Sequence, residues 1–339
     1  MGAHCPPGRS APLESPGIVI RILIISDIHY AGPDEQARGA YESRLTTNPL
    51  KRALINFYRH YIWHRSPLQS NYLLEKCLDL AGPSDWVVAN GDFSCDSAFI
   101  GAADPAARAS AEICLGILRR RHGDHLFTVF GDHELGKKGL VGGAGGLRIE
   151  SWHRCVEDLQ LRPLWSHQEG RYTLMGVASS LIAFPVLEPE AVPEEVEEWK
   201  TLRAAYFREL ETLWRGLPRD ARIILFCHDP TALPFLWSQE FVRERSSQIE
   251  KTIIGHLHSP LILWQSAFLR GMPVIRFMGH SARRISQALH DARVWKYFHL
   301  ALCPSLAGIE LLKDGGYLEM ELDPEGREPL RLHRRYLPR

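Results

Sequence analysis

The segment Arg21-Ile22-Leu23-Ile24-Ile25-Ser26-Asp27-Ile28-His29 decides how the rest of the chain is interpreted. Its apolar, β-branched run predicts a buried strand, and the run stops at an acid and an imidazole two positions apart. Ligands of open α/β sheets lie beyond the carboxyl ends of the strands, so this strand would deliver Asp27 and His29 to a site. A turn acid beside an incidental histidine is the simpler explanation of this pair taken alone.

The same construction recurs four more times along the chain. Residues 85–90, 126–130, 222–227 and 251–254 are short apolar runs, and each is followed closely by an acid or a histidine. The residues that follow the runs are Gly91-Asp92, Gly131-Asp132-His133-Glu134, His228-Asp229-Pro230 and Gly255-His256-Leu257-His258. Random placement would not favour five strand ends in succession, so we interpret them as parts of one site.

Length and charge narrow the class of protein. A chain of 339 residues with 45% hydrophobic and 24% charged residues can bury a large core, and one large α/β domain is plausible. The formal net charge is zero. This removes the general electrostatic argument for a nucleic-acid or membrane-surface protein, although it allows a local basic patch.

Seven cysteines form an odd set without a CxxC pair, and most lie inside apolar segments, which indicates reduced core residues. Residues 1–17 are rich in Pro, Gly and Ser, so we expect a disordered leader that is neither a signal peptide nor an anchor. No segment reaches the roughly 20 apolar residues of a membrane span. We therefore expect a cytoplasmic enzyme without a membrane partner, and the sequence says nothing about its oligomeric state.

Residues 18–339 are expected to form a single domain of mixed sheets covered by helices. Further strands are predicted at residues 171–178, 273–278, 308–312 and 317–322, with residues 331–339 as an edge strand. Helices are predicted at residues 49–64, 68–80, 105–122, 147–159 and 193–215.

A helical insertion at about residues 30–68 follows the first strand. Its position allows it to overhang the site as a lid, and a helix that merely packs its aromatic side chains is an equally good reading. A glycine-rich loop at residues 136–146 lies beside the third strand end. Its Lys137 and Lys138, with Arg148, could steer an anionic substrate or simply be solvated.

The strand-end side chains have the chemistry of a metal centre. Three carboxylates and four imidazoles exceed what one transition metal takes, but they suit two metals about 3.5–4 Å apart that share a carboxylate. The absence of thiolate points to manganese, iron, zinc or similar ions rather than to calcium or structural zinc. The candidate residues are Asp27, His29, Asp92, Asp132, His228, His256 and His258, with His133 adjacent.

The order D-x-H, G-D, G-(N)-H-E, a strand-end H and G-H-x-H resembles the calcineurin-like metallophosphoesterase superfamily over residues 21–260. The resemblance implies a four-layer α/β/β/α sandwich of two mixed sheets flanked by helices. It further implies that Asp92 bridges two divalent ions, and that His133 protonates the leaving group or steadies the transition state. The first ion would be held by Asp27, His29 and His258, and the second by Asp132, His228 and His256.

The activity implied is hydrolysis of a phosphomonoester or phosphodiester, by a metal-bridging hydroxide that attacks phosphorus in line. Glu134 and Asp229 could accept hydrogen bonds from His133 or a ligand histidine, or could serve as capping residues. The family usually has Asn where this chain has Asp132. The extra carboxylate would make the loaded centre neutral, which favours monoanionic diesters or an alkaline optimum.

A second departure lies after the last motif, where His280 and the pair Arg283-Arg284 could contact substrate or be structural. Two other functions remain open. A nucleic-acid end-processing nuclease of the same fold is disfavoured by the neutral net charge. An inactive protein-binding scaffold is disfavoured by the complete ligand set. We expect a phosphorylated small molecule as the substrate.

Overall fold

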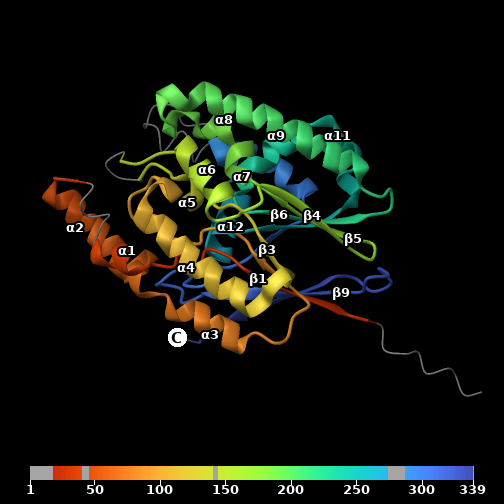
Figure 1. Ribbon diagram of the computed structural model, residues 1–339, viewed down its shortest axis with the longest axis horizontal. Coiled ribbons are helices and arrows are strands. Elements are labelled where there is room, and N and C mark those ends of the chain that lie inside the picture. Colours follow the sequence, from red (N-terminus) through yellow and green to blue (C-terminus); the bar gives the residue numbers. More distant parts are fainter. Residues whose placement is uncertain (1–17, 40–45, 140–143, 274–286, 339) are drawn as a thin grey trace, which may run out of the picture.

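A computed structural model describes residues 18–39, 46–139, 144–273 and 287–338. Two five-stranded sheets pack face to face, and helices cover the outer face of each sheet (Figure 1). This is the four-layer α/β/β/α arrangement that the sequence predicted, and both sheets are mixed.

The first sheet has the order β10-β9-β1-β2-β3. Strands β1, β2 and β3 run parallel, whereas β9 pairs antiparallel with both β1 and β10. The two last strands of the chain therefore complete the sheet that the first strand begins. The bounds are β1 (Ile20–Ile25), β2 (Trp86–Ala89), β3 (Leu126–Thr128), β9 (Gly316–Leu322) and β10 (Arg331–Tyr336).

The second sheet has the order β4-β5-β6-β7-β8, with β4 antiparallel to an otherwise parallel set. Its strands β5, β6 and β7 were predicted, and β4 and β8 were not. The bounds are β4 (Leu164–Glu169), β5 (Tyr172–Val177), β6 (Arg222–Cys227), β7 (Ile249–Ile254) and β8 (Leu300–Leu302).

Alternation along the strands builds two cores. In β1, Ile22 and Ile24 point between the sheets, where they belong to one cluster with Phe226 of the second sheet. Leu23 and Ile25 point to the other face and pack in the helix-side core. Because both faces of β1 are buried from Ile22 to Ile25, this part of the strand is an unbroken apolar run, and polar residues follow directly after it.

The predicted helices form with shifted ends. The helix predicted at 49–64 is an α-helix, α2 (Pro49–Tyr58), continued by a π-helix, η2 (Arg59–Trp63). The other predicted helices are α3 (Tyr72–Leu80), α4 (Pro105–His122), α6 (Ile149–Glu157) and α9 (Val196–Gly216). In Figure 1, α9 runs along the top of the molecule and α3 lies below the sheets.

The sequence missed several short helices, among them α10 (Leu233–Ser238), α11 (Glu240–Glu244) and α12 (Pro260–Phe268). The strand predicted at 308–312 is wrong, because these residues form a turn closed by hydrogen bonds from Leu312 and Lys313 to the carbonyl of Ile309. The strand predicted at 273–278 and the leader at 1–17 lie outside the described residues. No helix within the described ranges is long and apolar enough to cross a membrane.

Candidate metal centre

All seven predicted ligands converge beyond the carboxyl ends of β1, β2, β3, β6 and β7. Their ligand atoms fall into overlapping groups, each within 4.8 Å. One group is Asp27, His29 and His258, and another is Asp132, His228 and His256. Asp92 joins both sides, since it groups with Asp27 and His228 and also with His29 and His133.

The shortest distances place Asp92 in the middle of the cluster. Its Oδ2 lies 3.3 Å from Nε2 of His228, 3.8 Å from Nε2 of His133 and 3.9 Å from Nε2 of His29. On one side, Asp27 Oδ1 lies 3.5 Å from Nε2 of His258. The carboxylates are buried, whereas His29, His133 and His258 remain partly open to solvent. The cluster is therefore accessible from one edge.

Five of the seven side chains are held by left-handed backbone. The φ angles are 50° at Asp27, 49° at His29, 60° at Asp92, 58° at His256 and 59° at His258. Residues other than glycine rarely adopt this region, and such conformations concentrate at functional sites. The sharp turns reverse the chain as each strand ends, which aims the side chains into one cluster.

Backbone carbonyls fix the tautomers of three imidazoles. Nδ1 of His228 donates to the carbonyl of Asn90 at 2.6 Å, Nδ1 of His133 to that of Cys95 at 3.0 Å, and Nδ1 of His29 faces that of Ser94 at 3.3 Å. A nitrogen that faces a carbonyl must carry the proton. Each of these histidines therefore keeps a proton on Nδ1 and turns Nε2 toward the carboxylates, as metal ligands do.

The carboxylates are also held by neighbouring groups. The hydroxyl of Ser26 donates to Oδ2 of Asp27 at 2.6 Å. Glu134 accepts from the backbone N–H groups of Gly131, Asp92 and Phe93 at 2.7–2.9 Å, so it orients the turn that carries Asp92. Of the two roles considered for Glu134, these contacts match the capping role rather than acceptance from a histidine.

Asp229, the other acid considered for that role, caps the turn at Thr231, and its Oδ2 lies 4.0 Å from Nε2 of His256. It is therefore placed beside a predicted ligand, at the limit of an ion pair. Of the two roles considered for Asp229, the capping role has a hydrogen bond in the structure, whereas the approach to His256 is longer than a hydrogen bond.

The two carboxylate oxygens of Asp132 face different partners. Oδ1 faces Nδ1 of His256 at 3.0 Å and Nε2 of His228 at 3.4 Å, whereas Oδ2 accepts from the ammonium of Lys137 at 2.7 Å. Lys137 was expected only as a steering residue of the glycine-rich loop. Its ammonium therefore lies beside the carboxylate whose extra charge underlies the predicted preference for diesters or an alkaline optimum.

The charges of the cluster support one another. Burial raises the pKa of Asp92, but His228 and His133 outweigh it, so the pKa lies well below the usual value. Burial lowers the pKa of His228, yet Asp92 and Asp27 more than reverse this. Burial and the nearby Lys137 lower the pKa of His133 to about 3.

Two buried atoms at the centre test whether a cation fits. Oδ2 of Asp92 and Nε2 of His228 are both fully buried, and neither makes a hydrogen bond within the described chain. Buried polar atoms are normally paired, and a carboxylate oxygen beside an imidazole nitrogen is a pair of donors that one cation can satisfy together. Oxygen and imidazole donors suit divalent transition metals, so the residues fit the predicted ions.

The end of the helical insertion lies against the centre. The indole of Trp63 is 5.0 Å from the ring of His258, which in turn stacks on His29 at 5.3 Å. Of the other residues considered in the sequence, Lys138 donates to the carbonyl of Pro189 and Arg148 to that of Leu147. His280, Arg283 and Arg284 lie outside the described residues.

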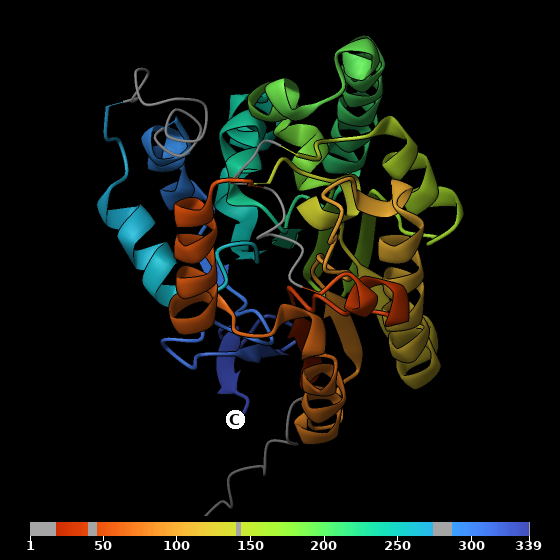
Figure 2. The same cartoon turned by 90° about the vertical axis from the view of Figure 1, so that its left-hand side faces the viewer.

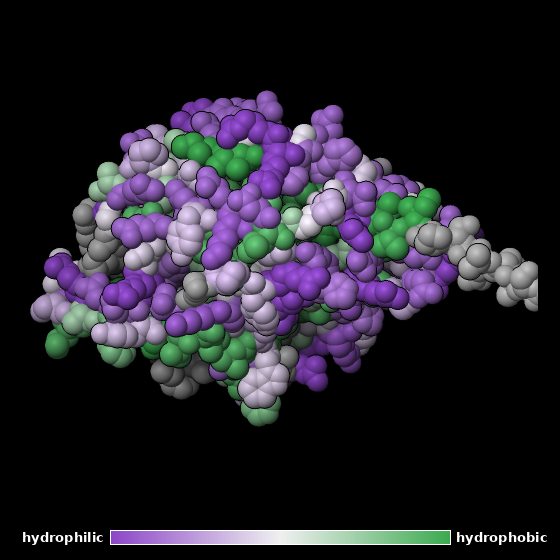
Figure 3. All heavy atoms as spheres, turned by 90° about the horizontal axis from the view of Figure 1, so that it is seen from below, coloured by the Kyte–Doolittle hydropathy of each residue, from purple (hydrophilic) through white to green (hydrophobic). Residues whose placement is uncertain are grey.

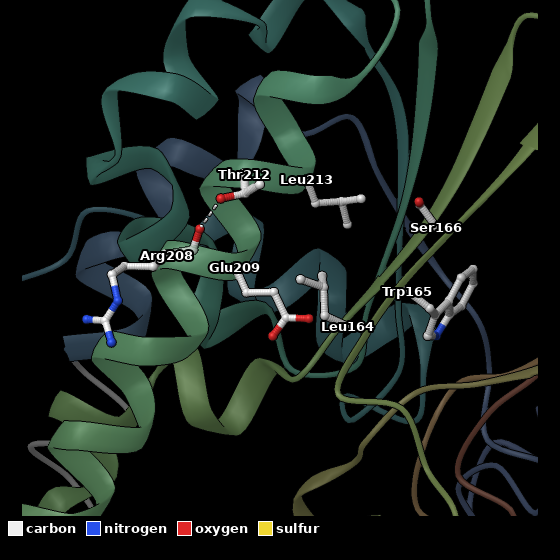
Figure 4. Close-up of a pocket in the computed structure, with 7 residues that line it drawn as sticks. All are labelled: Leu164, Trp165, Ser166, Arg208, Glu209, Thr212 and Leu213. Atoms are coloured by element: carbon white, nitrogen blue, oxygen red, sulfur yellow. Dashed lines mark hydrogen bonds between the residues drawn. The ribbon is translucent and has the colours of Figure 1, made fainter.

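A separate depression between α9 and β4 contains none of the predicted ligands. Figure 4 shows Arg208 pointing out beside it and Glu209 turned toward Leu164, with the hydroxyl of Thr212 bonded to the carbonyl of Arg208 at 2.8 Å. One acid and one arginine without a buried unpaired atom do not form a metal or nucleophile site.

The fold and the converging acids and imidazoles are those expected of a phosphoesterase scaffold. The model of the calcineurin-like phosphoesterase family matches residues 20–260, and the chain belongs to this family. No curated protein matches the chain.

Several solved structures are similar to this chain, and three of them are described here. Phosphopantetheinyl hydrolase from Mycobacterium tuberculosis is 14% identical with a TM-score of 0.38, over 72% of this chain and 85% of its own. A purple acid phosphatase from yellow lupin (Lupinus luteus) seeds is 12% identical with a TM-score of 0.34, over 72% and 38%. A predicted phosphoesterase from Streptococcus pneumoniae is 10% identical with a TM-score of 0.29, over 94% and 99%.

Proposed function

We propose that the protein hydrolyses a phosphomonoester or phosphodiester with two divalent metal ions, of manganese, iron or zinc. The observation that carries this proposal is the buried, unpaired Oδ2 of Asp92, which has imidazoles from both sides of the cluster around it. Such an atom is the expected bridge between two ions. Family membership supports the phosphoester class of substrate.

Each ion has a proposed set of ligands. Asp27, His29 and His258 would hold the first, Asp132, His228 and His256 would hold the second, and Asp92 would serve both. Bound there, two divalent cations would supply hydroxide near neutral pH and neutralise charge on the phosphoryl oxygens.

The protein's own groups would set the geometry for that chemistry. The carbonyls of Asn90 and Ser94 keep a proton on Nδ1 of His228 and His29, which leaves Nε2 free to ligate. We propose that His133 acts on the leaving-group oxygen. Its Nδ1 is held by Cys95, so its Nε2 is the atom that faces the reaction.

Two further assignments are part of this proposal. The strands β9 and β10 lie beyond the family match and complete the first sheet, which supports one domain over residues 18–339. Six cysteines are free and buried, which supports a reducing compartment such as the cytoplasm.

Metal analysis with a substrate panel tests the proposal. We expect two equivalents of metal per chain, loss of turnover with chelator and recovery with manganese, iron or zinc. The panel contains 4-nitrophenyl phosphate, bis(4-nitrophenyl) phosphate, pyrophosphate and an oligonucleotide. Turnover of the oligonucleotide alone would identify a nuclease, and a metal-free protein without turnover under added metal would identify a scaffold.

The variant Asp92→Asn is expected to lose at least one equivalent of metal and about 10³-fold or more in turnover, because the shared carboxylate serves both ions. Asp79→Asn is the matched control, since Asp79 is an exposed acid paired with Arg121. Equal metal content and turnover in the two variants would contradict the proposed bridge.

A further inference from the structure

Helix α2 carries an apolar stripe that faces solvent. No residue of α2 is buried, and Leu50, Leu54 and Phe57 are 81%, 67% and 56% exposed. Their spacing of four and three residues puts them on one side of the helix, the pattern that usually faces a core. At the left end, where Figure 1 places α2, Figure 3 shows apolar residues beside strongly hydrophilic ones.

Helix α12 repeats this pattern. Leu261, Trp264 and Phe268 are 42%, 64% and 77% exposed and are spaced by three and four residues. The rings of Trp264 and Phe268 stack at 5.9 Å, so they form one apolar surface. Large contiguous apolar surfaces are uncommon on soluble proteins and mark places of contact.

Both helices are joined to the candidate metal centre at His258. Trp63 is the last residue of η2, which continues α2, and its indole ring lies 5.0 Å from the His258 ring. The backbone carbonyl of Trp63 accepts from the N–H of Glu310 at 2.8 Å. Helix α12 starts at Pro260, two residues after His258. Both helices lie on the left of the view in Figure 2. We call α2, η2 and α12 the rim helices.

The charge of the two segments is one-sided. No Asp or Glu occurs between Glu42 and Glu75 or between Glu250 and Asp291, although the whole chain has as many acids as bases. Lys51, Arg52, Arg59 and Arg65 lie in the first of these segments, and Arg270 follows α12 in the second. Exposed Leu, Phe and Trp with Lys and Arg but no acids are the composition of helices that lie in a membrane interface.

We propose that the rim helices bind the surface of an anionic lipid bilayer. The apolar stripes would enter the boundary between headgroups and acyl chains, and the basic side chains would face the anionic headgroups. Nucleic acid would use the basic residues but not an exposed leucine stripe. A second copy of the chain would bring identical basic residues together, which is repulsive. The proposal replaces the expectation from the sequence that no membrane takes part.

Because the rim helices lie beside the candidate metal centre, their position also indicates a class of substrate. This inference about the substrate rests on the proposed function. A phosphoester carried by a lipid in that bilayer would reach the cluster past His258 without leaving the interface. The substrate would then be amphiphilic, with an anionic phosphoryl group on an apolar body.

Vesicle sedimentation of the full chain tests the binding without reference to catalysis. The probes are vesicles of phosphatidylcholine alone and vesicles with 30% phosphatidylglycerol. We expect binding to the anionic vesicles only. The double variant Leu54→Ser/Phe57→Ser should lower the partition coefficient about tenfold or more. Lys51→Gln/Arg52→Gln should lower it about fivefold per charge removed.

Matched controls keep the same chemistry elsewhere on the surface. Leu80→Ser removes an exposed leucine from the end of α3, and Arg120→Gln removes an exposed charge from α4. Both should bind anionic vesicles as the wild type does. The same variants test the proposed substrate. If Leu54→Ser/Phe57→Ser keeps its turnover of bis(4-nitrophenyl) phosphate but turns over phosphatidic acid in vesicles more slowly, the surface also serves the substrate.

Several results would overturn the proposal. Absence of binding to anionic vesicles would do so, as would equal binding by Leu54→Ser/Phe57→Ser and Leu80→Ser. A change from dimer to monomer in that double variant would show that a second copy covers the face. Binding of a short DNA that the apolar variant leaves intact, without vesicle binding, would assign the basic residues to nucleic acid. A wild type that binds vesicles but holds no metal would refute the proposed function alone.

Discussion

Replacing Lys137 with methionine tests how the centre tolerates Asp132. The ammonium lies 2.7 Å from Oδ2 of Asp132, and the Lys137 and Asp132 side chains are 25% and 6% exposed. A hydrogen bond between charged groups contributes about 1.5–3 kcal/mol, and partial exposure brings this pair to about 1–2 kcal/mol. That range corresponds to about 5–30-fold in a binding constant.

The charge of the metal-loaded centre decides whether phosphate affinity rises or falls in Lys137→Met. The ammonium offsets the extra carboxylate, so Asp132 with Lys137 has the net charge of the asparagine usual in the family. Lys137→Met leaves the carboxylate uncompensated. We expect affinity for a phosphate dianion to fall about 5–30-fold, while affinity for manganese stays equal or rises because the ligands are more anionic.

The assay is calorimetric titration of inorganic phosphate into the manganese-loaded protein, with a separate titration of manganese into the metal-free protein. The double variant Asp132→Asn/Lys137→Met should recover phosphate affinity to near the wild-type value, because both charges are then removed. Lys138→Met is the matched control, since the Lys138 ammonium donates to the carbonyl of Pro189 instead.

Two results would refute this reasoning. One is a phosphate affinity in Lys137→Met within twofold of that in Lys138→Met. The other is a double variant that falls as far as Lys137→Met alone, which would show that Lys137 acts independently of the Asp132 charge.

Three further outcomes are expected. Phe226→Ala, between the sheets, should cost about 3–5 kcal/mol in urea denaturation, whereas the exposed Phe268→Ala should change stability by less than about 0.5 kcal/mol; equal effects would contradict the core assignment. Ser26→Ala removes the hydroxyl that donates to Asp27 and should weaken manganese binding about 10-fold. Ser94→Ala should leave manganese binding unchanged, because the contact of Ser94 with His29 is made by its backbone carbonyl. Burial raises the pKa of Cys77 to about 12, so its thiol stays protonated at pH 8; in a Cys5→Ser background, iodoacetamide should label no cysteine before unfolding, and rapid labelling of the native protein would contradict this.

The strand ends could be predicted from the sequence because burial on both faces makes a central strand an unbroken apolar run. The first polar residues then mark the end of the strand, as at Ser26-Asp27 and His228. Strands β4 and β8 lack this signal. Strand β4 has only one buried position and ends in a glutamate, and β8 has three residues only.

The error at 308–312 has a tertiary cause. Ile309, Leu311 and Leu312 suit a strand by local preference, but the carboxylate of Asp314 accepts from the N–H of Ile309 at 2.8 Å and from the hydroxyl of Ser259. These contacts fold the segment into a turn with Lys313 in the left-handed region. Local preference is weak enough for such contacts to override it.

The candidate ligands were predictable, but the groups that orient them were not. The carbonyls of Asn90, Ser94 and Cys95 set the imidazole tautomers, and every residue of the chain has a carbonyl. The contact between Lys137 and Asp132 depends on how the chain leaves the short helix at Leu135, which no periodicity reveals.

The strands that follow residue 260 matter for the design of shortened versions of this protein. A fragment cut at residue 260, where the family match stops, would strip β9 from β1 and β8 from β7. Two central strands would become open edges, which recruit other chains. The hydroxyl of Ser305 that donates to the carbonyl of Asp27 would be lost as well. Such a shortened version should precipitate, even though it would retain every proposed ligand.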